Sequence, residues 1–245
     1  MINARGLSKT YRGVAALSAV ELTLARGRVL GIVGSNGSGR TTLLKILATQ
    51  LKPTSGQVAI DGVDILKHPF RVRPKIGYVS QSPSFYDYMN VGEFLRFVTA
   101  CRHDQPGNVR IPPDLNWPLA GLAPEMPLRS LSMGSKQKLA LTAALVYNPA
   151  LLLLDEPLSH LDPIAATHFH KLIRVHQAQG GTVIMACNRT ADVAALCDEA
   201  LFLHLGRVLG SVKIESPSDD LASAFRRLVE QSSAPALVRD PEKTA

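Results

Sequence analysis

A strand, a glycine-rich loop and a helix follow one another between residues 29 and 47. The apolar run from Val29 to Val33 is typical of a buried parallel strand, and the run from Thr41 to Leu47 is typical of a helix. In the loop between them, glycines occupy positions 34, 37 and 39. This order predicts a phosphate-binding loop, because glycines let backbone N–H groups point at a di- or triphosphate and the helix N-terminus adds partial positive charge.

The last residues of this loop determine how it would bind Mg²⁺ and the phosphates of a nucleotide. Thr41 stands where such a loop needs a hydroxyl for Mg²⁺, and Arg40 stands where it usually has a lysine. Arginine keeps the positive charge but replaces a compact ammonium by a larger planar fork. We therefore expect the loop to bind a nucleotide with Mg²⁺, and Arg40 to be able to misplace the γ-phosphate.

Length and composition narrow the class of protein. The chain has 245 residues, 46% of them hydrophobic, which suits one domain or one domain with a subdomain. No apolar run is long enough to span a bilayer and the N-terminus lacks a signal-peptide core, so we expect the protein to be made and kept in the cytoplasm. Three scattered cysteines predict neither a disulfide framework nor a metal site. The net charge of +7 is spread along the chain and argues only weakly for nucleic acid.

The predicted secondary structure changes from mostly strands to helices and loops and back again, and these two changes predict the domain boundaries. Alternating residues over 7–11, 20–24 and 56–62 predict a small antiparallel sheet, while strands over 76–81, 151–156, 182–186 and 200–204 predict an α/β sheet with crossover helices. Between Ser82 and Pro149, helices and proline-broken loops are expected instead. We expect an α/β core over 1–82 and 151–215, a helical subdomain over 83–150, and a C-terminal helix with a flexible tail over 216–245.

Three further motifs carry a resemblance to a known family. They are the stretch Leu-Ser-Met-Gly-Ser-Lys-Gln-Lys from Leu131 to Lys138, the acidic pair Asp155-Glu156 after a run of leucines, and Gln81. Together with the phosphate-binding loop, the sequence from about residue 2 to residue 210 resembles the ATP-binding subunit of ABC transporters, of the export type. The resemblance implies an α/β fold with a P-loop NTPase core of the ABC-ATPase type, a small antiparallel β subdomain and an inserted helical subdomain.

The resemblance also implies a set of site residues. Glu156 would be the general base that polarises the attacking water, Gln81 would sense Mg²⁺ and that water, and Asn188 stands near a switch-histidine position. Asp155 would join Thr41 and Gln81 around Mg²⁺. Tyr11 would stack on adenine. The phosphates of ATP would lie in the loop formed by Gly34, Ser35, Asn36, Gly37, Ser38, Gly39, Arg40, Thr41 and Thr42.

A second ATP-binding subunit completes the site in this family. Ser132 and Gly134, before and within the start of a helix, would face the γ-phosphate held by the partner's loop, and Asp162 lies in the loop that crosses to the partner. The resemblance therefore implies a homo- or heterodimer bound to a separate integral-membrane permease. That complex would place the chain peripherally at the cytoplasmic face of the cell membrane. No nucleic-acid partner is expected.

Four residues depart from the family pattern and bear on the rate of hydrolysis. They are Arg40, Asn188, Met133, which stands at one of the signature's glycine positions, and Ser135, which stands where glutamine is common. Asparagine carries neither a proton nor a positive charge, and losses at the transition state lower a rate more than they lower binding. Since Asp155 and Glu156 are intact, we expect ATP hydrolysis that drives transport, at a reduced rate from a degenerate nucleotide site.

Two other functions stay open on the sequence alone. The first is a poorly hydrolysing, regulatory ATP-binding subunit of a heteromeric ABC complex, whose partner would hydrolyse instead. The second is a soluble ABC ATPase acting on DNA or ribosomes, although such proteins usually carry coiled coils or tandem ATPase domains, and this sequence shows neither. The transported substrate and the direction of transport do not follow from any of these residues.

Overall fold

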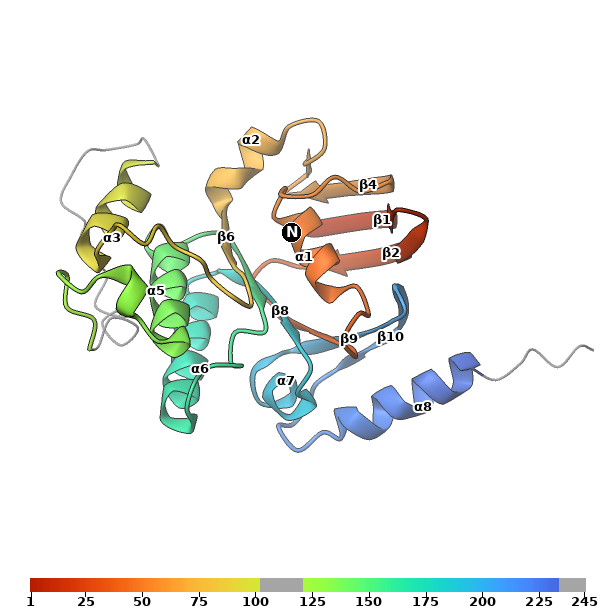
Figure 1. Ribbon diagram of the computed structural model, residues 1–245. Helices are drawn as coiled ribbons and strands as arrows, with labels where there is room; N and C mark the ends of the chain where they lie inside the picture. The colour runs from red at the N-terminus through yellow and green to blue at the C-terminus, as the bar shows by residue number, and fades with distance from the viewer. Residues whose placement is uncertain (102–120, 234–245) are drawn as a thin grey trace, which may run out of the picture.

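Two β-sheets enclose the first helix of the chain, α1 (Arg40–Leu47) (Figure 1). The computed structural model describes residues 1–101 and 121–233. The larger sheet has six strands, in the spatial order β10 (Arg207–Lys213), β9 (Glu199–His204), β3 (Val29–Val33), β8 (Thr182–Cys187), β7 (Leu151–Asp155) and β6 (Ile76–Val79). The smaller sheet has four strands, in the order β2 (Val14–Leu24), β1 (Ile2–Tyr11), β4 (Ser55–Ile60) and β5 (Val63–Asp64).

The larger sheet is parallel from β9 to β6, and only β10 pairs in the antiparallel sense. Helix α1 and the smaller sheet cover one of its faces. The other face is covered by α5 (Met133–Leu145), α6 (Pro163–Ala178), α7 (Thr190–Leu196) and α8 (Leu221–Ser233). A parallel sheet buried on both faces needs strands that are buried and mostly apolar, as β3, β7 and β8 are. The structure confirms the predicted α/β fold with its antiparallel β subdomain.

Strand β7 shows how this sheet divides the core. Successive side chains of a strand point to opposite faces. Leu151 and Leu153 pack in the cluster around α1, and Leu152 and Leu154 pack in the cluster that contains α5, α6 and α7. All four leucines are fully buried. The apolar run stops at Asp155, so the strand carries a carboxylate into the interior at its carboxyl end.

The smaller sheet is antiparallel, as predicted, but its first two strands are longer than the alternation of the sequence indicates. Strand β1 begins at Ile2, and its register against β2 shifts between Ala4 and Leu7. Gly6 lies in this irregularity with a φ of +57°. A bulge of this kind breaks the two-residue alternation, so the pattern seen from Leu7 onward does not extend to the residues before it.

The segment between β6 and β7 is helical. Of its described residues, 80–101 and 121–150, none belongs to the six-stranded sheet. It contains α3 (Val91–Ala100), a 3₁₀ turn (Leu128–Ser130) and α5, which share a small core of Val91, Leu95, Leu128, Leu131 and Leu139. The other elements of the described residues are α2 (Pro69–Val72) and a 3₁₀ turn (Arg73–Lys75) before β6. The division into 1–82 with 151–215, 83–150 and 216–245 stays a prediction, and its residues 102–120 and 234–245 lie outside the described residues.

Alanine substitutions at two adjacent leucines of β7 test the burial of both sheet faces. We expect Leu152→Ala and Leu153→Ala each to lower the free energy of unfolding by about 2–5 kcal/mol, because each removes a buried side chain from a different core cluster. Leu205, which is 73% exposed, provides the control, and Leu205→Ala should change that free energy by less than about 0.5 kcal/mol. Urea unfolding followed by circular dichroism measures all three. A large effect at only one of the two leucines would contradict a sheet covered on both faces.

Candidate functional site

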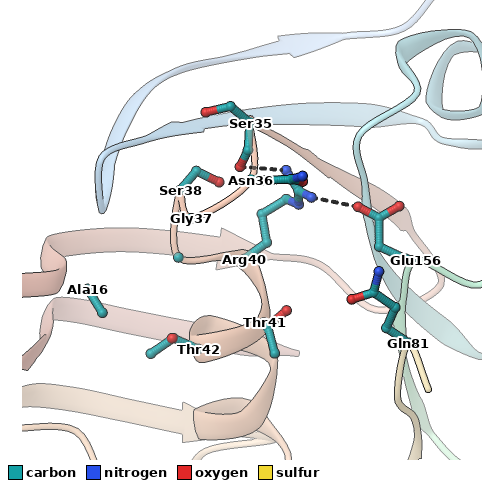
Figure 2. A pocket seen from close by; sticks show the side chains of 11 residues that line it. Ala16, Ser35, Asn36, Gly37, Ser38, Arg40, Thr41, Thr42, Gln81 and Glu156 are labelled. Atoms are coloured by element: carbon teal, nitrogen blue, oxygen red, sulfur yellow. Dashed lines mark hydrogen bonds and ion pairs between the residues drawn. The ribbon is translucent and has the colours of Figure 1, made fainter. Parts of the chain in front are cut away.

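A cavity of about 440 Å³ opens beside the carboxyl ends of β3 and β7 (Figure 2). The loop between β3 and α1 forms most of its wall, and Gln81 and Glu156 approach it from the neighbouring strand ends. Ligands of open α/β sheets bind at this edge, outside the carboxyl ends of the strands. The lining residues are Ala16, Ser35, Asn36, Gly37, Ser38, Gly39, Arg40, Thr41, Thr42, Gln81 and Glu156.

Close backbone contacts shape the loop. Gly39 precedes α1 with a φ of +104°, a conformation that favours glycine. A Cβ on Gly39 would lie 2.4 Å from the carbonyl oxygen of Ala16, so β2 approaches the loop too closely for any larger residue. The N–H of Gly206, in the turn between β9 and β10, donates to the carbonyl of Ser38 at 3.0 Å. The loop is therefore held between β2 and the turn that joins β9 to β10, with the first residues of α1 at the cavity.

Arg40 joins this loop to the end of β7 (Figure 2). Its Nη1 donates to the carbonyl oxygen of Ser35 at 3.0 Å, and its Nη2 donates to Oε1 of Glu156 at 2.5 Å. The side chains of Arg40 and Glu156 are only 8% and 6% exposed. A buried cation and a buried carboxylate thus neutralise each other at the cavity wall, which is how proteins retain ionised groups away from water.

Glu156 is positioned by its backbone as well as by Arg40. It has a φ of +47°, a left-handed conformation that is rare for residues other than glycine. Its N–H donates to the carbonyl of Ala186 in β8 at 2.9 Å, and its Oε2 accepts from the N–H of Asn188 at 3.4 Å. Strand β8 therefore holds the residue that follows β7. Backbone strain of this kind is commonly found at functional sites.

Asp155 and Thr41 provide oxygen ligands at the same end of the sheet. Burial raises the pKa of the Asp155 carboxyl, and a hydrogen bond with the Thr41 side chain and the charges of Arg40 and Lys45 act against that rise. Oδ1 of Asp155 is buried without a hydrogen-bond partner. Mg²⁺ prefers oxygen ligands and keeps several of its waters. A hydroxyl beside a carboxylate with an unused acceptor atom fits that ion.

Comparison with known proteins agrees with this geometry. Residues 17–159, more than half of the chain, match the family described as ABC transporter. This chain belongs to the ABC transporter family. The ABC transporter ATP-binding protein NatA of Bacillus subtilis (strain 168) is 32% identical to it over 210 residues, which cover 83% of this chain and 84% of NatA.

Solved structures show the same fold. The structure of an ATP binding subunit of an ABC transporter has a TM-score of 0.85 at 24% identity, and covers 94% of this chain and 99% of that one. A dimeric ATP-binding cassette in a post-hydrolysis state, bound to ADP and Pi, has a TM-score of 0.79 at 23% identity, and covers 88% of this chain and 100% of that one.

Membership of the ABC transporter family establishes the general role of the chain. It is an ATP-binding subunit, an ABC-type ATPase that energises transport through an ABC permease. ATPases of this family dimerise and pair with permeases. Within the parts of the chain that the structure describes, no helix is long and apolar enough to cross a membrane.

The structure brings some of the predicted site residues together around the cavity. Residues 35–42, Gln81 and Glu156 line it, and Gly34 and Asp155 adjoin lining residues in the chain. Gln81 lies in a loop, because β6 ends at Val79 and is shorter than predicted. Ala16 also lines the cavity and was not predicted. Its only signal would have been the close approach of β2 to Gly39, which is a tertiary contact.

Other predicted site residues of this ABC subunit lie away from the cavity. Tyr11 is exposed at the end of β1, with the Lys9 ammonium 5.1 Å from its ring centroid. Ser132 and Asp162 cap the N-termini of α5 and α6 through their side chains. A Cβ on Gly134 would lie 2.8 Å from the carbonyl oxygen of His160, so the signature-like stretch packs beside the loop that leads to Asp162.

Replacing Asp155 by asparagine tests the cost of its buried carboxylate. A folded-state pKa raised above the ordinary 3.8 means that the folded chain binds more protons than the unfolded chain between those two pKa values, so stability falls as pH rises through that window. In the absence of nucleotide and Mg²⁺, we expect Asp155→Asn to raise the melting temperature at pH 7, with a smaller gain toward pH 4. Thermal unfolding at several pH values measures this. A lower melting temperature at pH 7 would mean that the bonds of the carboxylate outweigh the cost of burying it.

Proposed function

We propose that this subunit binds ATP with Mg²⁺ in the cavity and hydrolyses it slowly at Glu156, to drive transport through a separate permease. One observation carries the proposal: a glycine loop at a helix N-terminus, a buried guanidinium and two buried acidic residues meet at the ends of β3 and β7. Phosphoryl transfer depends almost entirely on positioning and on electrostatic stabilisation, and these groups supply both.

The loop and its surroundings would hold the nucleotide. Backbone N–H groups from Gly34 to Thr42 and the N-terminus of α1 would face the phosphates, because partial positive charge gathers there. Thr41 and Asp155, with Gln81, would hold Mg²⁺, which neutralises phosphate charge when it is bound. Tyr11, a residue 43% exposed at the end of β1, would stack on adenine through its ring.

Glu156 would act as the general base. Glu156 lines the cavity, where its carboxylate would reach a water molecule beside the phosphates of a bound ATP. Gln81 lines the same cavity and points toward Glu156, so its amide would orient that water (Figure 2). Asn188, whose N–H contacts Glu156, would stand beside the γ-phosphate.

A second ATP-binding subunit, identical or different, would complete the site. Ser132 and Asp162 are exposed at the beginnings of α5 and α6, where they would face the nucleotide in the partner's loop. Docked on its permease, the dimer would lie at the cytoplasmic face of the cell membrane as a peripheral component. No nucleic-acid partner is part of this proposal.

The reduced rate follows from residues around the γ-phosphate. Arg40 offers a planar fork where a lysine offers a compact charge, and Asn188 lacks the proton that a histidine can carry. Met133 adds a side chain at a glycine position of the signature, and it is 39% exposed. The same departures favour a second candidate, a regulatory subunit that binds ATP and leaves hydrolysis to a different partner. The ATPase rate of the purified transporter, with Glu156 substituted in this subunit alone, distinguishes the two.

Glu156→Gln tests the assignment of the general base. The amide keeps the shape of the side chain but cannot take a proton, so we expect the hydrolysis rate to fall by about 10²–10⁴-fold. ATP should still bind. Phosphate release by the purified transporter and fluorescence of a labelled ATP measure the two properties, with Glu21→Gln as a control carboxylate outside the cavity lining. An unchanged hydrolysis rate would remove Glu156 from the mechanism.

Restoring the family residues tests whether the site is degenerate. We expect Arg40→Lys combined with Asn188→His to raise turnover by about tenfold or more, since a single preorganised transition-state contact is worth about that much or more. The affinity for ATP should change little. Phosphate release by the double variant, by each single variant and by the wild type measures the effect. A double variant no faster than the wild type would show that these residues do not limit the rate.

A further inference from the structure

The contacts of Arg40 and Glu156 occupy the very atoms that ATP hydrolysis would use. Both terminal nitrogens of the guanidinium donate to protein oxygens, one to the Ser35 carbonyl and one to Glu156. Both oxygens of the Glu156 carboxylate accept from protein donors, one from Arg40 and one from the N–H of Asn188. The cation of the loop and the base of β7 are therefore bound to each other.

This pairing affects the two partners in different ways. The guanidinium of Arg40 occupies Oε1 of Glu156, so this oxygen is not free to accept a hydrogen bond from the attacking water while the pair holds. A guanidinium bonded to a carboxylate has less charge to offer a phosphate. Because both side chains are more than nine-tenths buried, solvent ions screen their attraction far less than they screen an exposed pair.

We propose that the Arg40–Glu156 pair is an autoinhibitory latch, which keeps the general base inactive until the phosphates of ATP take over the guanidinium. The inference rests on the function proposed above and adds a regulation of the same site. Phosphate oxygens match the planar fork of arginine as well as a carboxylate does, and ATP carries more negative charge than Glu156. ATP therefore competes with Glu156 for Arg40. Displacement frees Oε1 to accept a hydrogen bond from the attacking water.

The planar fork is what makes this latch specific to arginine. The guanidinium reaches Ser35 and Glu156 at once, through two nitrogens held in a fixed plane. A lysine at position 40 would have a single nitrogen on a flexible stem. It would still attract phosphate, but it would not bridge the Ser35 carbonyl and Glu156 through two nitrogens of fixed geometry. The latch thus predicts that residues 40 and 156 are energetically coupled in nucleotide binding.

A double-mutant cycle on the affinity for ATPγS with Mg²⁺ measures this coupling. We choose ATPγS so that the titration measures binding alone, because hydrolysis of ATP during the titration would disturb the measured affinity. Wild type, Glu156→Gln, Arg40→Lys and the double variant are compared by isothermal titration. We expect Glu156→Gln to tighten binding by about tenfold beside Arg40, and by no more than about twofold in the Arg40→Lys background. Asp61→Asn is a matched control, because it removes the carboxylate of another arginine pair, Arg26–Asp61, whose residues do not line the cavity.

Each outcome of this cycle has a distinct meaning. If Glu156→Gln tightens ATPγS binding equally in the wild-type and Arg40→Lys backgrounds, Glu156 only repels phosphate, and the latch is overturned. Tighter ATPγS binding by Asp61→Asn would also overturn the latch, since the loss of any carboxylate would then be enough to raise the affinity. If no variant binds ATPγS while all four keep a cooperative thermal unfolding transition, the proposed function itself fails. The latch and the proposed function are both supported if Glu156→Gln tightens ATPγS binding much more beside Arg40 than in the Arg40→Lys background, while Asp61→Asn leaves the affinity unchanged.

Discussion

The buried ion pair between Arg40 and Glu156 joins two parts of the chain that are 116 residues apart in sequence. It ties the start of α1 to the end of β7, and these elements carry the loop and the acidic pair of the site. Taking two charges out of water is costly, and removing one partner of such a pair typically destabilises a protein by about 3–5 kcal/mol. Buried hydrophobic residues would stabilise the same junction at lower cost. An ion pair here is therefore better explained by the chemistry of the site than by the stability of the fold.

The arrangement of the larger sheet makes this pairing possible. Strands β3, β8 and β7 are neighbours and parallel, so the residues that follow them emerge at one edge. The glycine loop follows β3, Glu156 follows β7 and Asn188 follows β8. Three segments that are distant in the sequence thus meet at one edge of the sheet, where the first two line the cavity and the N–H of Asn188 contacts Glu156. The leucines of β7 anchor this edge to both halves of the core, which keeps the carboxylates in place.

Much of this fold could be predicted from the sequence, because its strongest signals are local. Apolar runs marked β3, β7 and β8, and the glycine spacing marked the loop before α1. The sequence could not show the bulge at Gly6 or the position of Ala16, since both depend on how β2 packs against its neighbours. It also could not show that Arg40 binds Glu156. Motifs identified each residue separately, and only the sheet order brings the two side chains into contact.

The family assignment and the departures from its pattern answer different questions. Membership of the ABC transporter family accounts for the fold, for ATP binding and for a role in transport. The latch proposed at Arg40 concerns when this particular subunit hydrolyses ATP. The most direct measurement is a crystal structure of the wild-type chain with Mg²⁺ and ATPγS. We predict that the Arg40 guanidinium contacts phosphate oxygens and that its bond to Glu156 is broken. A bound nucleotide with the Arg40–Glu156 bond still in place would contradict this account.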